Sequence, residues 1–314
     1  MLRPTAPIRV RVPATSANIG VGFDSIGLAL ACYNTFTVAW ATTDEHQLAP
    51  TANSTVTFPP LQGEACLGNI FFESAQALWH HVHGDTSMPL PPLAVTSETH
   101  IPLARGLGSS ATAVVGALVG LNALMGSPCT QAHLLKLAIA LEGHPDNVAP
   151  ALLGGVQLGN LTESYALPWP EGWHCAVIIP DTPIKTEDAR QALPTDYPRA
   201  DVALALRNSA LLTHALHTAN ATLLQQILQH DVVHEPYRLP LIPQGNEIQR
   251  TLAGVEGCLG VTVSGSGSTL LVVYLAEAWP ALRDTWQTLQ AQYPAYQSVE
   301  LTPYPLDTQG AICI

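Results

Sequence analysis

The chain has 314 residues, of which 47% are hydrophobic and 11% are charged, and its formal net charge is −12 at neutral pH. This apolar composition excludes a disordered chain and predicts a globular protein with a sizeable core. Because 12 Lys and Arg residues stand against 24 Asp and Glu residues, the chain has too little positive charge to neutralise a nucleic-acid backbone, and nucleic acid is excluded as a partner.

The start of the chain, MLRPTAPIRVRVPA, lacks the apolar stretch of a secretory signal peptide. The six cysteines are scattered and form no CxxC pair, which is typical of small buried side chains in a reducing compartment. The longest apolar run, residues 111–125, is too short to span a bilayer and predicts a buried helix instead. We therefore expect a cytoplasmic protein that does not enter a membrane.

The first half of the chain mixes strand and helix patterns. Ile8, Val10 and Val12 alternate with arginines, which predicts a half-buried strand, and residues 28–40 and 93–99 also have strand character. Thr130 precedes apolar residues at helical spacing, and that helix is expected to end near residues 143–145.

A proline-rich stretch at residues 168–170 predicts a boundary between two domains, residues 1–165 and 166–314. After it, the pattern predicts a strand over 174–179, a helical region over 201–230, a β-hairpin over 260–274 and a helix over 277–292. Mixed strands and helices of this kind indicate an α+β fold.

A glycine-rich segment, PLARGLGSSA at residues 102–111, follows one predicted strand and precedes the apolar helix. Glycines let the backbone approach a ligand closely, and a helix N-terminus offers free N–H groups to an anion. The segment therefore predicts a phosphate-binding loop.

Three interpretations of this loop compete: a strand–helix turn with a serine cap, a dinucleotide fingerprint of the form GxGxxA, and a triphosphate loop. The fingerprint needs an acidic residue about 20 positions later at the end of a second strand, whereas the first acid after the loop is Glu142, on a predicted helix. The chain has no GxxxxGK[ST] segment and no HRD or DFG triplet, so the nucleotide loop belongs neither to the P-loop class nor to the protein kinases.

Three segments together resemble the GHMP kinases: PATSANIGVGFD at 13–24, the glycine loop at 102–111 and VSGSGST at 263–269. The resemblance implies a two-domain α+β fold, with an N-terminal domain similar to ribosomal protein S5 domain 2 and a ferredoxin-like C-terminal domain. It also implies ATP and Mg²⁺ as cofactors, a nucleotide and substrate cleft between the domains, and a homodimer.

Within this family, the segments EGHPDNVAPALLGG (142–155), TEDAR (186–190) and HEPYR (234–238) resemble the homoserine kinase branch. The implied reaction is ATP-dependent phosphorylation of the side-chain hydroxyl of L-homoserine to O-phospho-L-homoserine, on the route to threonine. Val21 and Ser268 depart from the pattern, because they stand where the family motifs have prolines.

The resemblance also implies the site residues. ATP is expected at Asn69 and at Pro102, Arg105, Gly106, Leu107, Gly108, Ser109, Ser110 and Ala111, magnesium at Ser110 and Glu142, and catalysis at Asp146 and Asn147. The substrate is expected at Asn18, Asp24, His144, Asp146, Thr186, Arg190 and Arg238.

The chemistry of these side chains supports the expected roles. The two guanidinium groups match a substrate carboxylate, and the only lysines, Lys136 and Lys185, fall outside the matched pattern or in mid-helix. Asn147 carries an amide, which cannot accept a proton, so Asp146 is the remaining candidate base; it acts either as a base or by positioning the hydroxyl.

Two rival functions stay open at this point. One is another GHMP kinase that acts on mevalonate, a sugar or shikimate, and the other is a catalytically idle ATP-binding or regulatory protein on the same fold. The arginine pair and the HPDN run at 144–147 favour an amino-acid substrate, and the intact Ser110, Glu142, Asn147 and Arg238 argue against an idle protein.

Overall fold

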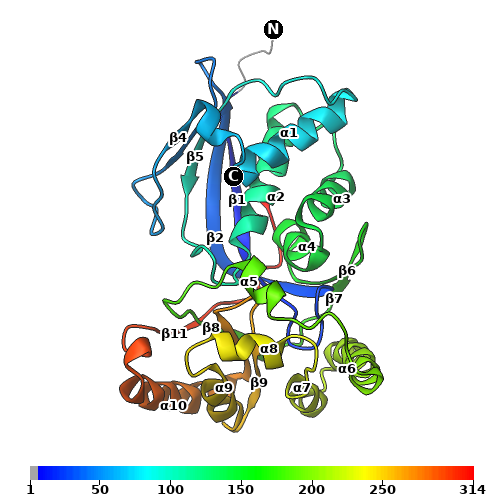
Figure 1. The fold of residues 1–314 in the computed structure, drawn as a ribbon, viewed down its shortest axis with the longest axis vertical. Helices are drawn as coiled ribbons and strands as arrows, with labels where there is room; N and C mark the ends of the chain where they lie inside the picture. Colours follow the sequence, from blue (N-terminus) through cyan, green and yellow to red (C-terminus); the bar gives the residue numbers. More distant parts are fainter. Residues whose placement is uncertain (1–5) are drawn as a thin grey trace.

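The computed structural model describes residues 6–314, which form two lobes, each built on one β-sheet (Figure 1). The eight strands of the first sheet are β1 (Ile8–Ala17), β2 (Ile26–Trp40), β3 (Gln47–Pro50), β4 (Leu61–Gln62), β5 (Leu93–Glu98), β6 (Val156–Gly159), β7 (Ser164–Leu167) and β12 (Ile312–Cys313). The four strands of the second sheet are β8 (Trp173–Ile178), β9 (Cys258–Val263), β10 (Leu270–Leu275) and β11 (Leu301–Pro303).

The first sheet is antiparallel except where β3 pairs with β5, and its long β1–β2 ladder carries an irregularity between Pro13 and Ala14. Four helices cover one face of it (Figure 1): α1 (Ile70–His83), α2 (Ser109–Leu124), α3 (Gln131–Glu142) and α4 (Pro145–Leu153). A short 3₁₀ helix, η1 (Gly63–Cys66), precedes α1.

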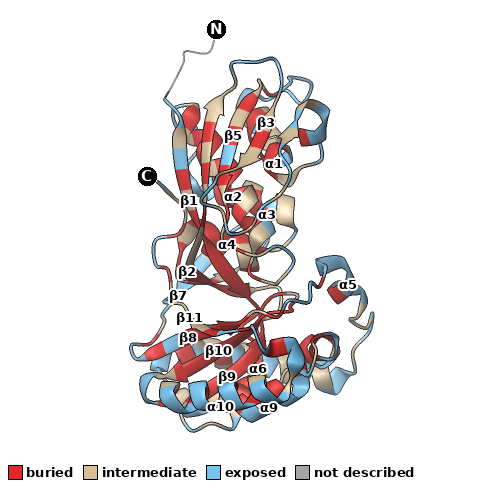
Figure 2. Cartoon of the chain, turned by 90° about the vertical axis from the view of Figure 1, so that its left-hand side faces the viewer, coloured by how far each residue is buried: buried red, intermediate tan, exposed pale blue. Residues whose placement is uncertain are grey.

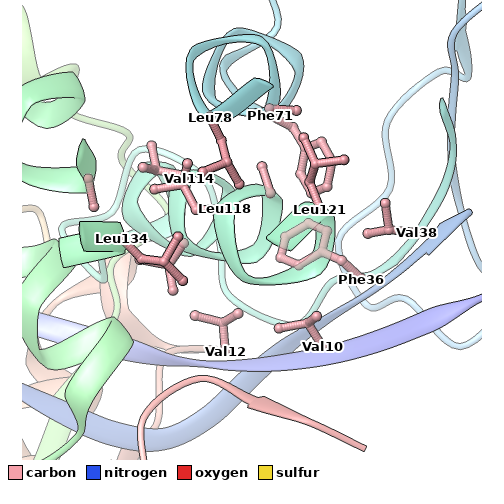
Figure 3. Packing of buried hydrophobic residues seen from close by; sticks show 14 of the residues in the cluster. Val10, Val12, Phe36, Val38, Phe71, Leu78, Val114, Leu118, Leu121 and Leu134 are labelled. Carbon is pink, nitrogen blue, oxygen red and sulfur yellow. The ribbon is translucent and has the colours of Figure 1, made fainter. Parts of the chain in front are cut away.

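The core of this lobe forms between the helices and strands β1 and β2, where Val10, Val12, Phe71 and Leu118 are fully or almost fully buried (Figure 3). Burial of each such side chain stabilises the fold by about 1.5–3 kcal/mol. Helix α2 lies unusually close to β2, because a Cβ on Gly116 would stand 2.4 Å from the Phe36 ring. This close packing sets the position of the α2 N-terminus.

The second lobe has the strand order β11–β8–β10–β9, and its elements follow the chain order β, α, β, β, α, β, which is the ferredoxin-like topology. Its helices are α5 (Thr186–Gln191), α6 (Arg199–Thr218), α7 (Ala221–Leu228), α8 (Glu235–Arg238), α9 (Gly245–Ala253) and α10 (Trp279–Gln292), with the 3₁₀ helices η2 (Leu239–Leu241), η3 (Ala276–Ala278) and η4 (Pro294–Tyr296).

The lobes share a hydrophobic core. Leu28 of the first sheet belongs to the same buried cluster as Val177 and Leu271 of the second sheet and Leu228 of α7. In Figure 2 the strands near the junction of the lobes are coloured as buried, whereas the outer sides of α9 and α10 are exposed. The last strand, β12, returns to pair with β1, with Ile312 opposite Arg11, so the chain crosses between the lobes twice.

Most of the predicted elements are confirmed, including the strand that begins at Ile8, the buried helix α2 and the helix α3 with Thr130 as its N-cap. The helical region over 201–230 is instead two helices, α6 and α7, because the chain turns at Ala219 with a positive φ of 51°. The α+β class and the ferredoxin-like C-terminal lobe are confirmed.

The division into residues 1–165 and 166–314 stays a prediction, although the change of sheet falls between β7 and β8. In the described part of the chain, residues 6–314, no helix has both the length and the hydrophobicity that crossing a bilayer requires.

Candidate active site

The three glycine-containing motifs lie far apart in the sequence but contact one another at the junction of the lobes. Ser264 of the third motif donates from Oγ to the carbonyl oxygen of Gly106 in the glycine loop, at 2.6 Å. Asn18 of the first motif donates from Nδ2 to the carbonyl oxygen of Gly265, at 3.2 Å. The third motif therefore holds the glycine loop, and the first motif holds the third.

The glycine loop has a conformation and surroundings that require glycine. Gly106 and Gly108 have φ values of 74° and 66°, where a side chain is strained. A Cβ on Gly106 would stand 2.1 Å from the Ser264 carbonyl oxygen, and one on Gly108 would stand 1.9 Å from Thr15 Oγ1.

Helix α2 begins directly after this loop, and no side chain caps its N-terminus. This argues against the serine-capped turn, because neither Ser109 nor Ser110 satisfies the first N–H groups of the helix. Those N–H groups and the helix dipole are left to attract an anion.

Two adjoining cavities open beside the loop. The first, the polar cavity of about 120 Å³, is named for the polar and charged side chains of most residues on its wall, which are Asn18, Asp24, Ala104, Arg105, Gly106, Gly108, Ser109, Ser110, Glu142, His144, Asp146, Asn147, Thr186, Arg190, Arg238, Gly265 and Ser266. The second, of about 540 Å³, is mostly apolar and is lined by Asn34, Phe36, Leu48, Phe58, Pro59, Leu61, Asn69, Ile70, Phe71, Ser97, Thr99, Leu103, Ala104, Ser109, Ser110, Ala113, Lys185 and Thr186. Both walls include Ala104, Ser109, Ser110 and Thr186, so the start of α2 stands where the cavities join.

All of the expected substrate residues line the polar cavity. Asp24 and Arg190 form a two-pronged ion pair, with both N···O distances 3.3 Å. His144 and Asp146 contact each other through Nδ1 and Oδ1, and with Asp24 they form a compact polar cluster. Burial of the His144 ring lowers its pKa, but the contact with Asp146 and the charges of Asp24 and Glu142 outweigh burial, so the pKa is raised overall.

Arg238 is a buried cation in the same cavity, with 3% of its surface exposed. Its Nη1 donates to the carbonyl oxygen of Gly265 at 2.9 Å, and its Nε donates to that of Ala189 at 3.5 Å. Burial lowers the pKa of this guanidinium, and the neighbouring Arg190 lowers it further, whereas Asp24 opposes the shift. Within residues 6–314 no carboxylate lies within 4.0 Å of Arg238, so its charge calls for an anionic ligand.

Asp146 and Asn147 lie in the first turn of α4, at the floor of the polar cavity. The start of α4 packs directly on β2, because a Cβ on Gly27 would stand 1.7 Å from the Asp146 carbonyl oxygen. Thr15 donates from Oγ1 to Asn147 Oδ1 at 2.7 Å, which sets the orientation of the amide and turns its NH₂ group away from Thr15.

Glu142 ends α3 and lies next to Ser110 at the start of α2. Burial is the main cause that raises the pKa of Glu142, and the charge of Asp146 adds to it, while His144 and a hydrogen bond with Ser110 lower it. Carboxylate and hydroxyl oxygens are ligands that suit Mg²⁺.

Three of the residues expected to bind ATP do not line either of the two cavities. Leu107 and Ala111 are buried in the cores, and neither they nor Pro102 line a cavity. Asn69 lines the apolar cavity, but its Oδ1 accepts from the Phe71 N–H at 3.0 Å as the N-cap of α1.

Some cavity residues were not singled out from the sequence. Gly265 and Ser266 line the polar cavity, and their place in the third motif was the available signal. The aromatic wall of the apolar cavity, with Phe36, Phe58 and Phe71, had no local signal because its members come from different elements.

Ser268 stands where the family pattern has a proline. Its hydroxyl donates to the Thr182 carbonyl oxygen at 2.5 Å.

Glu235, the first residue of α8, is a buried carboxyl that accepts from the Val263 N–H at 2.7 Å and from Gln249 Nε2 at 2.9 Å. Burial raises its pKa from 4.5 to about 8, and the charge of Asp231 adds to the shift. The stabilisation that this carboxyl contributes in its protonated form is fully present below its unperturbed pKa of 4.5. It is lost as the pH rises through about 8.

We therefore expect the free energy of unfolding to fall between about pH 5 and about pH 8, and Glu235→Gln to flatten that fall. Urea denaturation of wild type and variant across this range measures the effect. Glu277→Gln, at an exposed position, is the matched control and should keep the wild-type slope. A wild-type slope in Glu235→Gln would contradict the prediction.

Comparisons with known proteins show which proteins this chain is similar to. Residues 69–155 match the model of the GHMP kinases N-terminal domain. The homoserine kinase of a Synechococcus species is 41% identical over 89% of this chain and 91% of its own length, and that of Microchaete diplosiphon is 39% identical over 97% and 96%. Among solved structures, the homoserine kinase of Cytophaga hutchinsonii is similar with a TM-score of 0.82 at 23% identity, covering 100% of this chain and 99% of that one. The Methanococcus jannaschii mevalonate kinase shares the fold at a TM-score of 0.65 and 12% identity, covering 96% and 98%.

Proposed function

The chain belongs to the homoserine kinase family of the GHMP kinases, and on this premise we propose that its cleft transfers the γ-phosphoryl group of ATP to the side-chain hydroxyl of L-homoserine. The products are ADP and O-phospho-L-homoserine, on the route to threonine. The observation that carries the proposal is one polar cavity whose wall includes both the start of α2, which has no side-chain cap, and the buried Arg238, which has no carboxylate partner among residues 6–314.

ATP is proposed to bind across both cavities. The apolar cavity has the size and lining of a small-molecule site, and it suits the base and ribose. The triphosphate then extends past Ser109 and Ser110, which line both cavities, to the N–H groups of the glycine loop and α2.

Magnesium fits the two oxygen ligands Ser110 and Glu142, because both are hard donors that stand beside the proposed phosphate site. When bound, the ion would neutralise charge on the β- and γ-phosphates. The cluster of Asp24, His144 and Asp146 is assigned to the substrate instead, because it lines the polar cavity together with Arg190 and Arg238, which suit a zwitterion rather than a metal ion.

The substrate is proposed to bind as a zwitterion. Its carboxylate pairs with Arg238 and Arg190, and its ammonium pairs with Asp24. The zwitterion thus replaces the Asp24–Arg190 ion pair and gives each partner a new opposite charge. Thr186 and Asn18 complete the polar wall around it.

The substrate hydroxyl is proposed to lie between Asp146 and Asn147. As its oxygen bonds to the γ-phosphorus and the bond to ADP breaks, the hydroxyl proton passes to Asp146. The amide of Asn147, oriented by Thr15, holds the hydroxyl in line. Phosphoryl transfer needs mainly such positioning and charge neutralisation.

The direct test is release of ADP from MgATP with and without L-homoserine. We expect release that depends on L-homoserine, and little or none with mevalonate, a sugar or shikimate. A preference for one of these alcohols would favour the rival kinase function. ATP binding without turnover of any acceptor would favour the idle nucleotide-binding protein.

Replacing Arg238 with leucine is expected to raise the KM for L-homoserine by about 10–150-fold, because a charge-assisted hydrogen bond is worth about 1.5–3 kcal/mol. The KM for ATP should change little. Steady-state kinetics with both substrates varied gives the result.

Homoserine amide is the matched control substrate, since it lacks the carboxylate. The wild type should use it poorly, and Arg238→Leu should distinguish amide from acid far less. Loss of ATP affinity instead would assign Arg238 to phosphate, and equal use of acid and amide by the wild type would contradict the amino-acid assignment.

A cytoplasmic location and a homodimer are part of the proposal. The reaction consumes ATP, and the cysteines are free, which fits a reducing compartment. Light scattering coupled to size-exclusion chromatography tests the homodimer.

A further inference from the structure

The arginine side chains near the proposed triphosphate site already have partners within the protein. Arg105 of the glycine loop donates from Nε to the Pro180 carbonyl oxygen at 2.8 Å and from Nη2 to that of Asp181. Arg190 is paired with Asp24, and Arg238 is buried behind Gly265. Apart from the proposed Mg²⁺ and the N–H groups of α2, a free cation for the triphosphate therefore has to come from another element.

Lys185 stands at the required place. It lines the apolar cavity, and among the described residues on that wall it is the one with a charged side chain. The next residue, Thr186, lines both cavities. Lys185 is exposed, and within residues 6–314 no carboxylate lies within 4.0 Å of it.

The backbone before Lys185 is anchored to the glycine loop. The N–H of Ile184 donates to the Ala104 carbonyl oxygen at 3.1 Å, and the Ile184 side chain is buried. Three further bonds hold the same segment: Arg105 donates to the Pro180 and Asp181 carbonyl oxygens, and Ser268 donates to that of Thr182. The start of the lysine side chain is therefore fixed beside the loop, while its flexible stem leaves the ammonium free to reach along the cavity.

We propose that Lys185 binds the triphosphate of ATP at the point where the apolar cavity meets the start of α2. This inference rests on the proposed function, because it takes the apolar cavity as the nucleoside site. The triphosphate is proposed to run from the apolar base pocket to the N–H groups of α2, and it passes this junction. An ammonium group there can form charge-assisted hydrogen bonds with the phosphate oxygens. Helix α5, which Lys185 precedes, stands out beside the junction of the lobes in Figure 2.

The first test is kinetic and uses Lys185→Met. We expect the KM for MgATP to rise about tenfold, the lower end of the range for a charge-assisted bond, because the lysine is exposed. The KM for L-homoserine should stay the same, and Lys185→Arg should restore most of the ATP affinity. Adenosine, titrated calorimetrically, should bind wild type and Lys185→Met alike, because it has no phosphate.

The other lysine of the chain provides the matched control. Lys136 is exposed on α3 and lines neither cavity, so Lys136→Met should leave both KM values unchanged. An unchanged KM for MgATP in Lys185→Met would overturn the proposal. An equal rise in Lys136→Met would also overturn it, since the effect would then report net charge.

A second test uses chemical modification with pyridoxal 5′-phosphate followed by borohydride reduction, located by peptide mass spectrometry. With two lysines in the chain, we expect saturating ATP to protect Lys185 and to leave Lys136 labelled. Equal labelling of Lys185 with and without ATP would overturn the inference. The failure of the proposed function is distinct, because it would appear as wild-type protein that releases no ADP with L-homoserine.

Discussion

Replacing Asp146 with asparagine is expected to lower kcat by about 10²–10⁴-fold, the loss associated with removal of a general base. Asp146 is 2% exposed and lines the polar cavity. Its Oδ1 contacts His144, and no hydrogen bond to Oδ2 occurs among residues 6–314. That second oxygen is therefore left for the substrate hydroxyl, whereas the neighbouring Asn147 can only orient it.

The exchange of carboxylate for amide keeps the shape of the side chain, so the binding of ATP and L-homoserine should change much less than kcat. Single-turnover kinetics isolates the chemical step, and calorimetric titration of each substrate shows that the variant is intact. His144→Gln serves as a comparison, because it removes the partner of Asp146 and keeps the carboxylate. A loss of only a few-fold in Asp146→Asn would assign Asp146 a positioning role.

Replacing Gly108 with valine is expected to abolish detectable ATP binding. The residue has a φ of 66° and directly precedes α2. A Cβ there would stand 1.9 Å from Thr15 Oγ1 and 3.2 Å from Asn147 Oδ1. The branched side chain would occupy the space in which the loop approaches phosphate and would push Thr15 away from Asn147. Calorimetric titration with MgATP measures the loss.

Gly84→Val separates this effect from general backbone strain. Gly84 follows α1 as its C-cap with the same φ of 66°, but no atom lies within 4 Å of its ideal Cβ. This control should lose some stability, roughly 1 kcal/mol, and keep its ATP affinity. Thermal unfolding of both variants shows whether each is folded. Unchanged ATP affinity in folded Gly108→Val would mean that the loop only connects β5 to α2.

The sequence by itself determined much of the local structure and the membership of the family. The alternation at Ile8, Val10 and Val12 predicted β1, because a strand buries every second side chain. Thr130 predicted the start of α3, since its hydroxyl accepts from the His133 N–H at 3.3 Å. The glycine loop was predicted because positive φ values and close backbone approach need glycine wherever the loop lies in the fold.

The break between α6 and α7 was not predicted. It depends on Ala219 in a left-handed conformation, which its residue type disfavours. The pairing of β12 with β1 was also missed, because two residues at the chain end carry no pattern, and their partners lie about 300 positions away.

The details of the site were decided by the tertiary structure. The family resemblance of the sequence predicted Asp24, Arg190 and Arg238 as substrate residues. Only the folded chain shows that Asp24 forms an ion pair with Arg190 and that Arg238 is buried with no carboxylate partner among residues 6–314. It also commits Arg105 to backbone carbonyls and brings Lys185 to the wall of the apolar cavity. Such assignments depend on side-chain direction and on contacts between segments far apart in the chain, and neither is encoded in local periodicity.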